Sequence, residues 1–204
     1  MKPQLEKIEH QAIMDWIEQD SSVLDLGCGD GDLLTHLIYE KKVHAQGIEI
    51  SAKAIHRCVA RGLSVLQEDI DSGLADYENE SFDYVVLNQT LQQVKKPDFV
   101  LHEALRVGKK VIIGFPNFLH ISARFQMFFR GKVPVTSSLP YVWFDTPNLH
   151  FLSVADFREY CERRKIRMLD SVFLRKNKRV RFFPNLFAET ALFLLTKHRS
   201  NIYK

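Results

Sequence analysis

Cysteine is scarce in this chain of 204 residues, and no cluster of metal-binding residues accompanies it. The three cysteines, Cys28, Cys58 and Cys161, are odd in number and far apart. None of them belongs to a C-x-x-C pair or to a His/Cys cluster at metal-ligand spacing. We therefore expect neither disulfides nor a metal site.

Long apolar runs are also missing. No stretch approaches the roughly 20 consecutive apolar residues of a membrane-spanning helix. The N-terminal sequence MKPQLEKIEHQAIMDWI is charged and periodic, and it lacks the apolar core of a signal peptide. We expect a soluble, cytoplasmic protein in which residues 1–204 form a single domain, because this length suffices for one sizeable core and is short for two.

Acidic residues are scarce in the second half of the chain. Residues 1–104 contain 9 Lys and Arg against 19 Asp and Glu, whereas residues 105–204 contain 19 against 6. The positive charge is densest over residues 163–181, which could meet nucleic acid or an acidic protein. Aromatic residues are sparse there, so we favour a solvated edge and hairpin turn over an RNA-binding surface.

Glycine is uncommon, at 9 residues, but three glycines fall close together. The stretch VLDLGCGDGDL, residues 23–33, is an apolar run that breaks at these glycines and resumes at helical spacing. This pattern predicts a buried strand that turns into a helix through a ligand-binding loop. Asp32 stands where the third glycine of a dinucleotide loop would be, and Asp30 and Asp32 would repel a pyrophosphate. A zwitterionic cofactor with an ammonium group suits the loop better.

Polar residues also end the next predicted strands, at the edge where open α/β sheets bind ligands. Glu49 lies 18 residues past Gly31, close to the offset at which an acid meets a ribose in doubly wound folds. Asp69 follows the next strand and could accept from an adenine amino group. Asn88 and Gln89 end a further strand and are candidates to touch the cofactor's amino-acid end or the acceptor. Each acid could instead be an ordinary solvated charge.

Strands and helices alternate about five times before residue 115, which is typical of a doubly wound parallel sheet. The expected strands are 23–26, 43–50, 64–66, 82–88 and 109–114. The expected helices are 3–19, 32–40, 52–61 and 99–107. Pairing of the fifth strand is expected to end at Phe115-Pro116-Asn117. Beyond residue 150, we expect a helix capped by Ser153 and then two strands, 166–174 and 192–196, that close the sheet as a hairpin.

Residues 115–150 differ from the alternating part. A helix is expected over 118–130, followed by prolines and aromatic residues. Its apolar face would carry Ile121, Phe125, Phe128 and Phe129. We interpret residues 115–150 as a helical and aromatic insertion or lid that could wall an acceptor site and exclude water. The alternatives are a dimer surface, a membrane-surface patch and simple coverage of the core.

Together these motifs resemble those of the class I S-adenosylmethionine-dependent methyltransferases, and more closely those of the MetW family of methionine-biosynthesis proteins. The resemblance is carried by VLDLGCGDGDLL (23–34), QGIEIS (46–51), SVLQEDID (64–71), FDYVVLNQTLQQV (82–94), IIGFPNFLHISARFQMFFRGKVPV (112–135) and LPYVWFDTPNLHFLSVADF (139–157). It implies a Rossmann-like α/β fold with a seven-stranded, mostly parallel sheet in the order 3-2-1-4-5-7-6, flanked by helices. The last strand would be antiparallel.

The resemblance also implies a cofactor, S-adenosyl-L-methionine (SAM) or its product S-adenosyl-L-homocysteine (SAH). In this reading Asp25 holds the ammonium through the loop or a water, Glu49 takes the ribose hydroxyls, and Ile50 packs on adenine. Asp69 and the Ile70 backbone would read the adenine edge. The full set of implied cofactor-binding residues is Asp25, Gly27, Cys28, Gly29, Glu49, Ile50, Asp69, Ile70, Asn88 and Gln89.

The function implied by the resemblance is a role in methionine biosynthesis alongside homoserine O-acyltransferase. Whether the protein transfers a methyl group or binds and regulates that partner is left open, and the methyl acceptor is unknown. The alternative is a stand-alone methyltransferase of an apolar small molecule, such as a quinone-like ring or a fatty acid. Candidates for a catalytic base are Tyr141, His150, Asp145 and His120. Each could equally be a packing residue.

Overall fold

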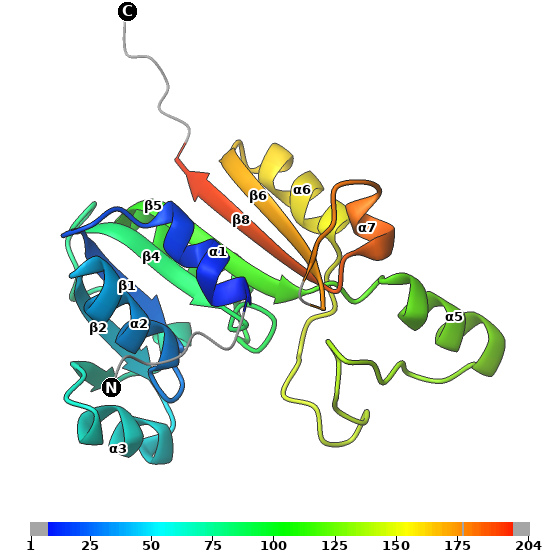
Figure 1. The fold of residues 1–204 in the computed structure, drawn as a ribbon, viewed down its shortest axis with the longest axis horizontal. Helices are drawn as coiled ribbons and strands as arrows, with labels where there is room; N and C mark the ends of the chain where they lie inside the picture. The colour runs from blue at the N-terminus through cyan, green and yellow to red at the C-terminus, as the bar shows by residue number, and fades with distance from the viewer. Residues whose placement is uncertain (1–7, 177, 198–204) are drawn as a thin grey trace, which may run out of the picture.

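The computed structural model describes residues 8–176 and 178–197, which form one sheet with helices on both faces (Figure 1). The helices are α1 (Ile8–Trp16), α2 (Asp32–Lys41), α3 (Ala52–Ala60), η1 (Ile70–Ser72, a 3-10 turn), α4 (Pro97–Val107), α5 (Ile121–Arg130), α6 (Val154–Arg163) and α7 (Pro184–Phe187). The strands are β1 (Ser22–Leu26), β2 (His44–Glu49), β3 (Val65–Gln67), β4 (Phe82–Asn88), β5 (Gly108–Pro116), β6 (Arg167–Arg175), β7 (Lys178–Arg179) and β8 (Thr190–Thr196). In the described part of the chain, no helix has the length and hydrophobicity that crossing a membrane requires.

The strands pair in the order β3-β2-β1-β4-β5-β8-β6-β7. The first five of these are parallel, and β8 lies antiparallel between β5 and β6. The expected order is therefore confirmed, with β8 as the expected seventh strand and with the final hairpin formed by β6 and β8. The sheet has eight strands rather than seven because the two-residue strand β7 pairs with the outer edge of β6.

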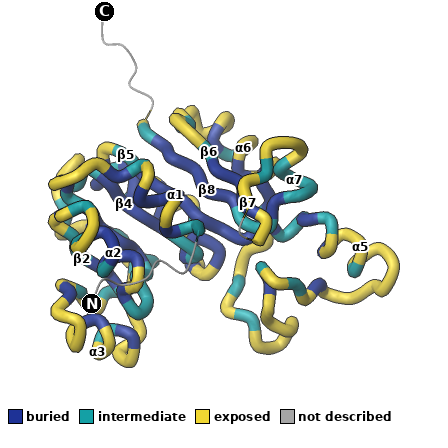
Figure 2. The backbone as a smooth tube through the Cα atoms, viewed as in Figure 1, coloured by how far each residue is buried: buried dark blue, intermediate teal, exposed yellow. Residues whose placement is uncertain are grey.

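Alternating residues of the central strands supply two apolar cores, one on each face of the sheet. Figure 2 shows the central strands as a mostly buried part of the backbone. In β4, Val85 and Leu87 contribute to the core beneath α4 and α6, whereas Tyr84 and Val86 contribute to the core beneath α1 and α2. This alternation follows from the period of two in a strand. It explains why the FDYVVLN strand is almost continuously apolar, since helices cover both faces.

Two boundaries near residue 116 differ from expectation. Pairing of the fifth strand ends within Phe115-Pro116-Asn117, as expected, but β5 runs past its expected end at residue 114, because it stays paired with β8 as far as Pro116 and Thr190. Proline is tolerated there because it is the last residue of the strand and β4 pairs with β5 only up to Gly114. The next helix begins at Ile121 because the His120 ring accepts a hydrogen bond from the Ser122 N–H (3.2 Å) and caps it.

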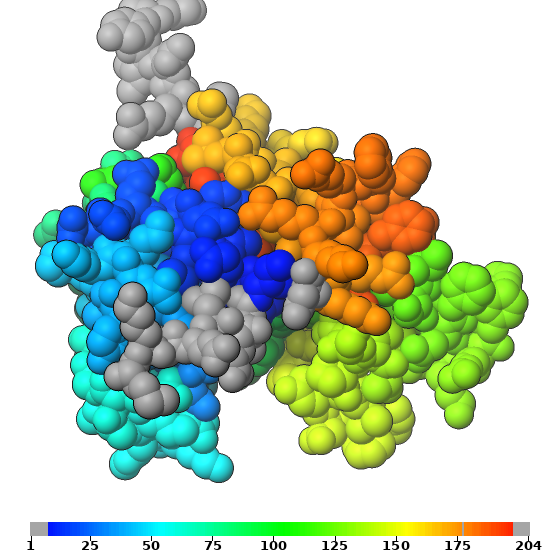
Figure 3. Space-filling view, in the orientation of Figure 1, coloured from blue at the N-terminus to red at the C-terminus, as the bar shows by residue number. Residues whose placement is uncertain are grey.

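Residues 118–151 form a segment that extends beyond the end of β5, away from the two cores (Figure 3, green to yellow). Within α5 only Ala123 is buried. Phe125, Phe128 and Phe129, which lie on the expected apolar face, are 57%, 82% and 69% exposed. Simple coverage of the core is therefore the wrong interpretation of this helix. The first helix, expected over residues 3–19, is observed as α1 (Ile8–Trp16). Residues 3–7 of that expectation lie outside the described residues.

Candidate functional site

The glycine loop joins β1 to α2 at the carboxyl edge of the parallel strands. The N–H groups of Gly27 and Cys28 both donate to the Ile48 carbonyl, at 2.8 and 3.1 Å, which holds the loop against β2. Gly27 has φ of +75°, and a Cβ atom there would lie 2.7 Å from both Cγ2 and Oγ1 of Thr90. Glycine is therefore required at this position for backbone conformation and for space.

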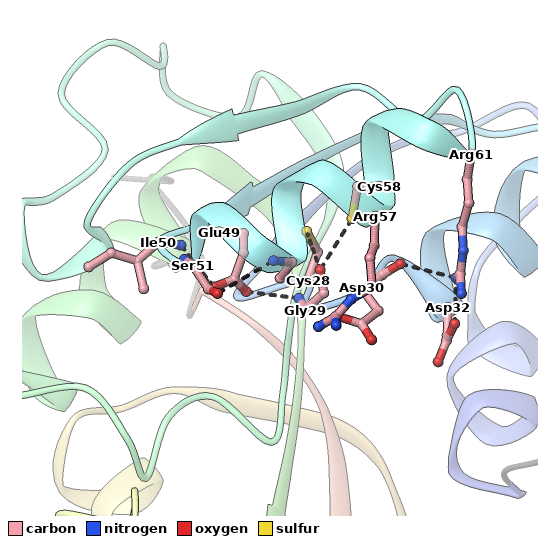
Figure 4. A network of polar contacts seen from close by, with 11 residues as sticks. Cys28, Gly29, Asp30, Asp32, Glu49, Ile50, Ser51, Arg57, Cys58 and Arg61 are labelled. Carbon is pink, nitrogen blue, oxygen red and sulfur yellow. Dashed lines mark hydrogen bonds and ion pairs between the residues drawn. The ribbon is translucent and has the colours of Figure 1, made fainter.

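The Glu49 carboxylate at the end of β2 is the centre of the loop's hydrogen bonding (Figure 4). Its Oε2 accepts from the Gly29 N–H at 2.9 Å, and its Oε1 accepts from the Ile50 and Ser51 N–H groups at 2.9 and 2.8 Å. Hydrogen bonds to a charged acceptor are stronger than neutral ones. The carboxylate therefore ties the glycine loop to the first turn that leads into α3.

Asp25 lies at the carboxyl end of β1, beneath the same loop, and is 3% exposed. Among the described residues no cation forms an ion pair with it. Burial, with a further contribution from the Glu49 charge, raises the pKa of Asp25 from 3.8 to about 7. A buried carboxylate without a counterion suits a site that receives a cationic ligand group.

The two acids of the loop are paired in a way that the sequence did not predict. Asp30 forms an ion pair with Arg57 at 2.5 Å, and Asp32 forms one with Arg61 at 2.5 Å (Figure 4). Both arginines come from α3 or its C-cap, far along the chain. Their charges offset the two acids, so the argument that Asp30 and Asp32 repel a pyrophosphate loses most of its force.

Asp69 and Asp71, which follow the end of β3, have different hydrogen-bonding roles. Asp69 is exposed, and its Oδ1 accepts from the Asp71 N–H at 3.0 Å, which caps the turn that begins at Ile70. Asp71 accepts from the N–H groups of Lys95 and Lys96 at 2.9 and 2.8 Å and so fixes the loop before α4. Ile50, which follows β2, has its carbonyl 3.4 Å from the Gln67 side chain at the end of β3 and is 62% exposed. An exposed apolar side chain next to an acid is compatible with the expected adenine contacts, which stay predictions.

The end of β4 holds a buried polar atom that has no partner in the described part of the chain. The Asn88 Oδ1 is buried and accepts no hydrogen bond among the described residues, and Gln89 has φ of +60°, which is uncommon for a residue other than glycine.

Gln92 was missed by the sequence reasoning. Its side-chain Nε2 donates to the Gln89 carbonyl at 3.0 Å, and its own carbonyl accepts from Leu149 and His150 N–H groups at 2.9 and 3.1 Å. No sequence pattern marks this contact, because it joins segments more than fifty residues apart.

The candidate bases do not converge. Tyr141 lines a cavity of about 220 Å³ with Trp143, whereas His150 lines another of about 220 Å³ between α4 and α6. His120 is 1% exposed, caps α5, and has a pKa that burial lowers. Asp145 is exposed. The structure therefore brings the loop and strand-end candidates to one edge and leaves the candidate bases apart.

The basic segment 163–181 is partly neutralised. Arg164 pairs with Asp98 at 2.8 Å and Arg179 pairs with Asp15 at 3.2 Å, while Arg163 pairs with a glutamate one helical turn earlier. These pairs are distributed over α6 and the β6–β7 turn, as expected for a solvated edge.

Comparison with known proteins decides the family. A family model described as methionine biosynthesis protein MetW matches residues 7–195. The chain belongs to the MetW family. The bifunctional methionine biosynthesis protein MetXA/MetW of Rhodopirellula baltica is 32% identical over 207 residues, which cover 95% of this chain and 33% of that protein. The chain thus spans about a third of the length of this curated relative.

Solved structures give the fold of this MetW-family chain. A SAM-dependent methyltransferase from Archaeoglobus fulgidus matches with a TM-score of 0.69 at 15% identity, over 93% of this chain and 91% of that one. A TehB-like SAM-dependent methyltransferase from Corynebacterium glutamicum matches with a TM-score of 0.61 at 16% identity, over 95% and 89% of the two chains. The cyclase SpnF matches with a TM-score of 0.66 at 15% identity, over 93% and 80%.

These matches confirm the Rossmann-like methyltransferase fold, and at such identities they show the fold alone. SpnF, whose name describes a cyclase, shares the fold, so the fold does not establish methyl transfer. The family match makes the chain a methyltransferase-like protein of methionine biosynthesis.

The Gly27 contact with Thr90 predicts a stability difference between two glycines of equal φ. Gly27 and Gly62 both have φ of +75°, but a Cβ at Gly62 meets nothing within 4 Å. Gly62→Ala should cost about 1–2 kcal/mol of unfolding free energy, for the left-handed backbone alone. Gly27→Ala should cost at least about 1 kcal/mol more, because it also overpacks against Thr90. Urea unfolding of the two variants measures these costs. Thr90→Ala combined with Gly27→Ala should recover the extra cost at Gly27, whereas equal costs at the two glycines would contradict the prediction.

The raised pKa of Asp25 predicts a pH-dependent gain from Asp25→Asn. The folded state keeps the proton up to about pH 7 while the unfolded state loses it near 3.8, so the wild type loses stability as the pH rises between these values. The variant should therefore gain about 2–3 kcal/mol relative to wild type between pH 5 and pH 8, measured by urea unfolding.

Asp83→Asn is the control for that measurement. Its hydrogen bonds with Lys109 and Ser22 lower the pKa of Asp83 to about 2, so its stabilisation is lost only in more acidic solution. The difference in unfolding free energy between Asp83→Asn and wild type should therefore stay constant between pH 5 and pH 8. A flat profile for Asp25→Asn as well would contradict the account of Asp25.

Proposed function

We propose that this MetW-family protein binds SAM or SAH at the edge formed by the carboxyl ends of β1, β2, β3 and β4. The observation that carries the proposal is the buried Asp25 carboxylate, which has no cationic partner among the described residues and lies beneath a glycine loop. Both SAM and SAH carry an ammonium group that would supply the missing positive charge. The acids Glu49 and Asp69 follow at the ends of the next two strands.

In this proposal each strand end contacts one part of the cofactor. The methionine part lies against the backbone of Gly27, Cys28 and Gly29, with Asp25 opposite the ammonium. Glu49 accepts from the ribose hydroxyls with lone pairs that its bonds to Gly29, Ile50 and Ser51 leave over, since two carboxylate oxygens offer about four acceptor sites. Further contacts come from Ile50, Asp69, Ile70, Asn88 and Gln89.

SAM supplies a methyl group on a sulfonium that departs readily, so methyl transfer from it needs chiefly positioning. In this proposal residues 115–150 form a lid that walls the acceptor site and excludes water, within a single domain of residues 1–204. We name no catalytic base, because Tyr141 and His150 line separate cavities. The buried acceptor atom of Asn88 suits a ligand group that donates a hydrogen bond.

We further propose that the protein acts in the cytoplasm with homoserine O-acyltransferase. The support is the name of the Rhodopirellula baltica relative, in which a MetXA part and a MetW part share one chain. Fusion holds two modules at high effective concentration, which favours partners that function together. SAM is the end product of the methionine branch, so its binding could report methionine supply if the acyltransferase prefers one ligand state.

A stand-alone methyltransferase is the second candidate. Its support is the cavity of about 220 Å³ lined by Phe118, Tyr141, Trp143 and Phe151, which suits an apolar acceptor. Consumption of SAM in the presence of a metabolite extract, reduced by Trp143→Ser, would favour it over the binding role.

Calorimetric titration with SAM, SAH and adenosine tests the proposed cofactor. Asp25→Asn should weaken SAM and SAH at least about tenfold, because a hydrogen-bonded charge is worth on the order of 1.5–3 kcal/mol. Adenosine lacks the ammonium and should bind both proteins equally. Equal SAM affinity in wild type and variant, or no SAM binding at all, would overturn the proposal. Repeating the titration with acyltransferase present should change the SAM affinity if the two sites are linked.

A further inference from the structure

The segment of residues 118–151, here called the apolar projection, exposes large side chains that the fold does not use. Phe128, Trp143 and Phe144 are 82%, 73% and 72% exposed. On α5, Phe129 stacks with Phe125 at 5.2 Å between ring centroids and meets Phe128 edge-on at 4.9 Å. Monomeric proteins rarely leave so many aromatic rings together in water, and such patches mark interaction sites.

The composition of the apolar projection is that of the centre of a protein–protein interface. Residues 118–144 contain no Asp or Glu, and their charged residues are Arg124, Arg130 and Lys132. Interface centres are enriched in Tyr, Trp, Phe, Met and Arg and depleted of acidic residues. Trp, Tyr and Arg also dominate the residues that carry binding energy.

The apolar projection also contains a preformed cavity. Its cavity of about 220 Å³ is walled by Phe118, Val133, Leu139, Tyr141 and Trp143, and it has room for one large side chain of a partner. The Gln126 side chain donates to the Val135 carbonyl at 3.0 Å and accepts from the Val135 N–H at 3.1 Å, which ties the loop to α5. A preformed pocket lowers the ordering cost of binding.

The far end of the apolar projection is fastened to the proposed cofactor edge. The N–H groups of Leu149 and His150 donate to the Gln92 carbonyl, and the Gln92 side chain donates to the carbonyl of Gln89 at the end of β4. A partner on the apolar projection would therefore be connected through Gln92 to Gln89, one of the residues proposed to contact the cofactor.

We infer that the apolar projection is the surface on which this protein docks homoserine O-acyltransferase, through an apolar face of the enzyme with acidic groups at its rim. The inference rests on the proposed partnership and adds where the partner binds. The fused Rhodopirellula baltica relative identifies the partner, and the excess of positive charge with no acid over residues 118–144 identifies the charge of the complementary rim.

A second copy and a membrane fit this surface less well. A twofold dimer uses the same patch on both copies, which would gather six cations and no acid from residues 118–144 of the two copies at one interface. A membrane-surface helix lies flat in the interface with a strongly charged polar face. Here the exposed apolar residues are divided between α5 and a loop that forms a concave pocket, and the segment carries three cations.

Binding of the purified acyltransferase, measured by calorimetry, tests this inference with surface variants of the full chain. Phe128→Ser combined with Phe129→Ser, and separately Trp143→Ser, should raise the Kd at least about tenfold, as truncation of exposed aromatic anchors does at interfaces. Arg130→Glu should slow association and reduce its salt dependence. Tyr39→Ser is the matched control, because Tyr39 is 67% exposed on α2, away from the apolar projection; its Kd should stay within about twofold of wild type.

SAM titration of each variant separates this inference from the proposed function. Unchanged SAM affinity with weakened acyltransferase binding supports the docking surface. No complex with wild type would overturn both the partnership and the surface, whereas a wild-type complex that all the variants retain would overturn the surface alone. Two outcomes would show that something other than the acyltransferase occupies this surface, if acyltransferase binding is the same in the variants and wild type. One is binding to phosphatidylserine–phosphatidylcholine vesicles that the variants lose, and the other is a dimer that the variants lose.

Discussion

The Glu49 carboxylate is the contact on which the geometry of the site depends. By accepting from Gly29, Ile50 and Ser51 it joins the loop after β1 to the turn after β2, two segments that the parallel sheet only brings side by side. Beneath it, Asp25 is buried without a counterion among the described residues, which costs stability at neutral pH. A protein that retains such a cost has a use for the charge, and stability given up at a binding site is a common trade.

The fold was largely predictable because its signals are local. The strand over Phe82–Asn88 is almost continuously apolar, Ser51 caps α3 through the Ala54 N–H, and Ser153 forms a capping box with Asp156. The strand-end positions of Glu49 and its neighbours also followed from the alternation of elements, since parallel strands end at one edge. These predictions needed only periodicity, caps and spacing.

What escaped prediction depends on contacts between distant segments. The Arg57 and Arg61 partners of the loop acids come from another helix, and the anchoring of Leu149 on Gln92 spans the chain from β4 to the end of the insertion. Coverage of the core could not be excluded for the apolar face of α5 from sequence, because the periodicity of a helix reports one apolar side without reporting what covers it. In this protein that side is left exposed.

The backbone amides held by Glu49 offer the most direct measurement of the central claim, that this edge binds an adenosyl cofactor. In a ¹H–¹⁵N spectrum recorded during titration with SAH, the amide signals of Gly29, Ile50 and Ser51 should shift together and saturate. The Gly62 amide, which donates to the Val59 carbonyl at the end of α3, should stay in place. Saturating shifts elsewhere, with these three amides unmoved, would contradict the account.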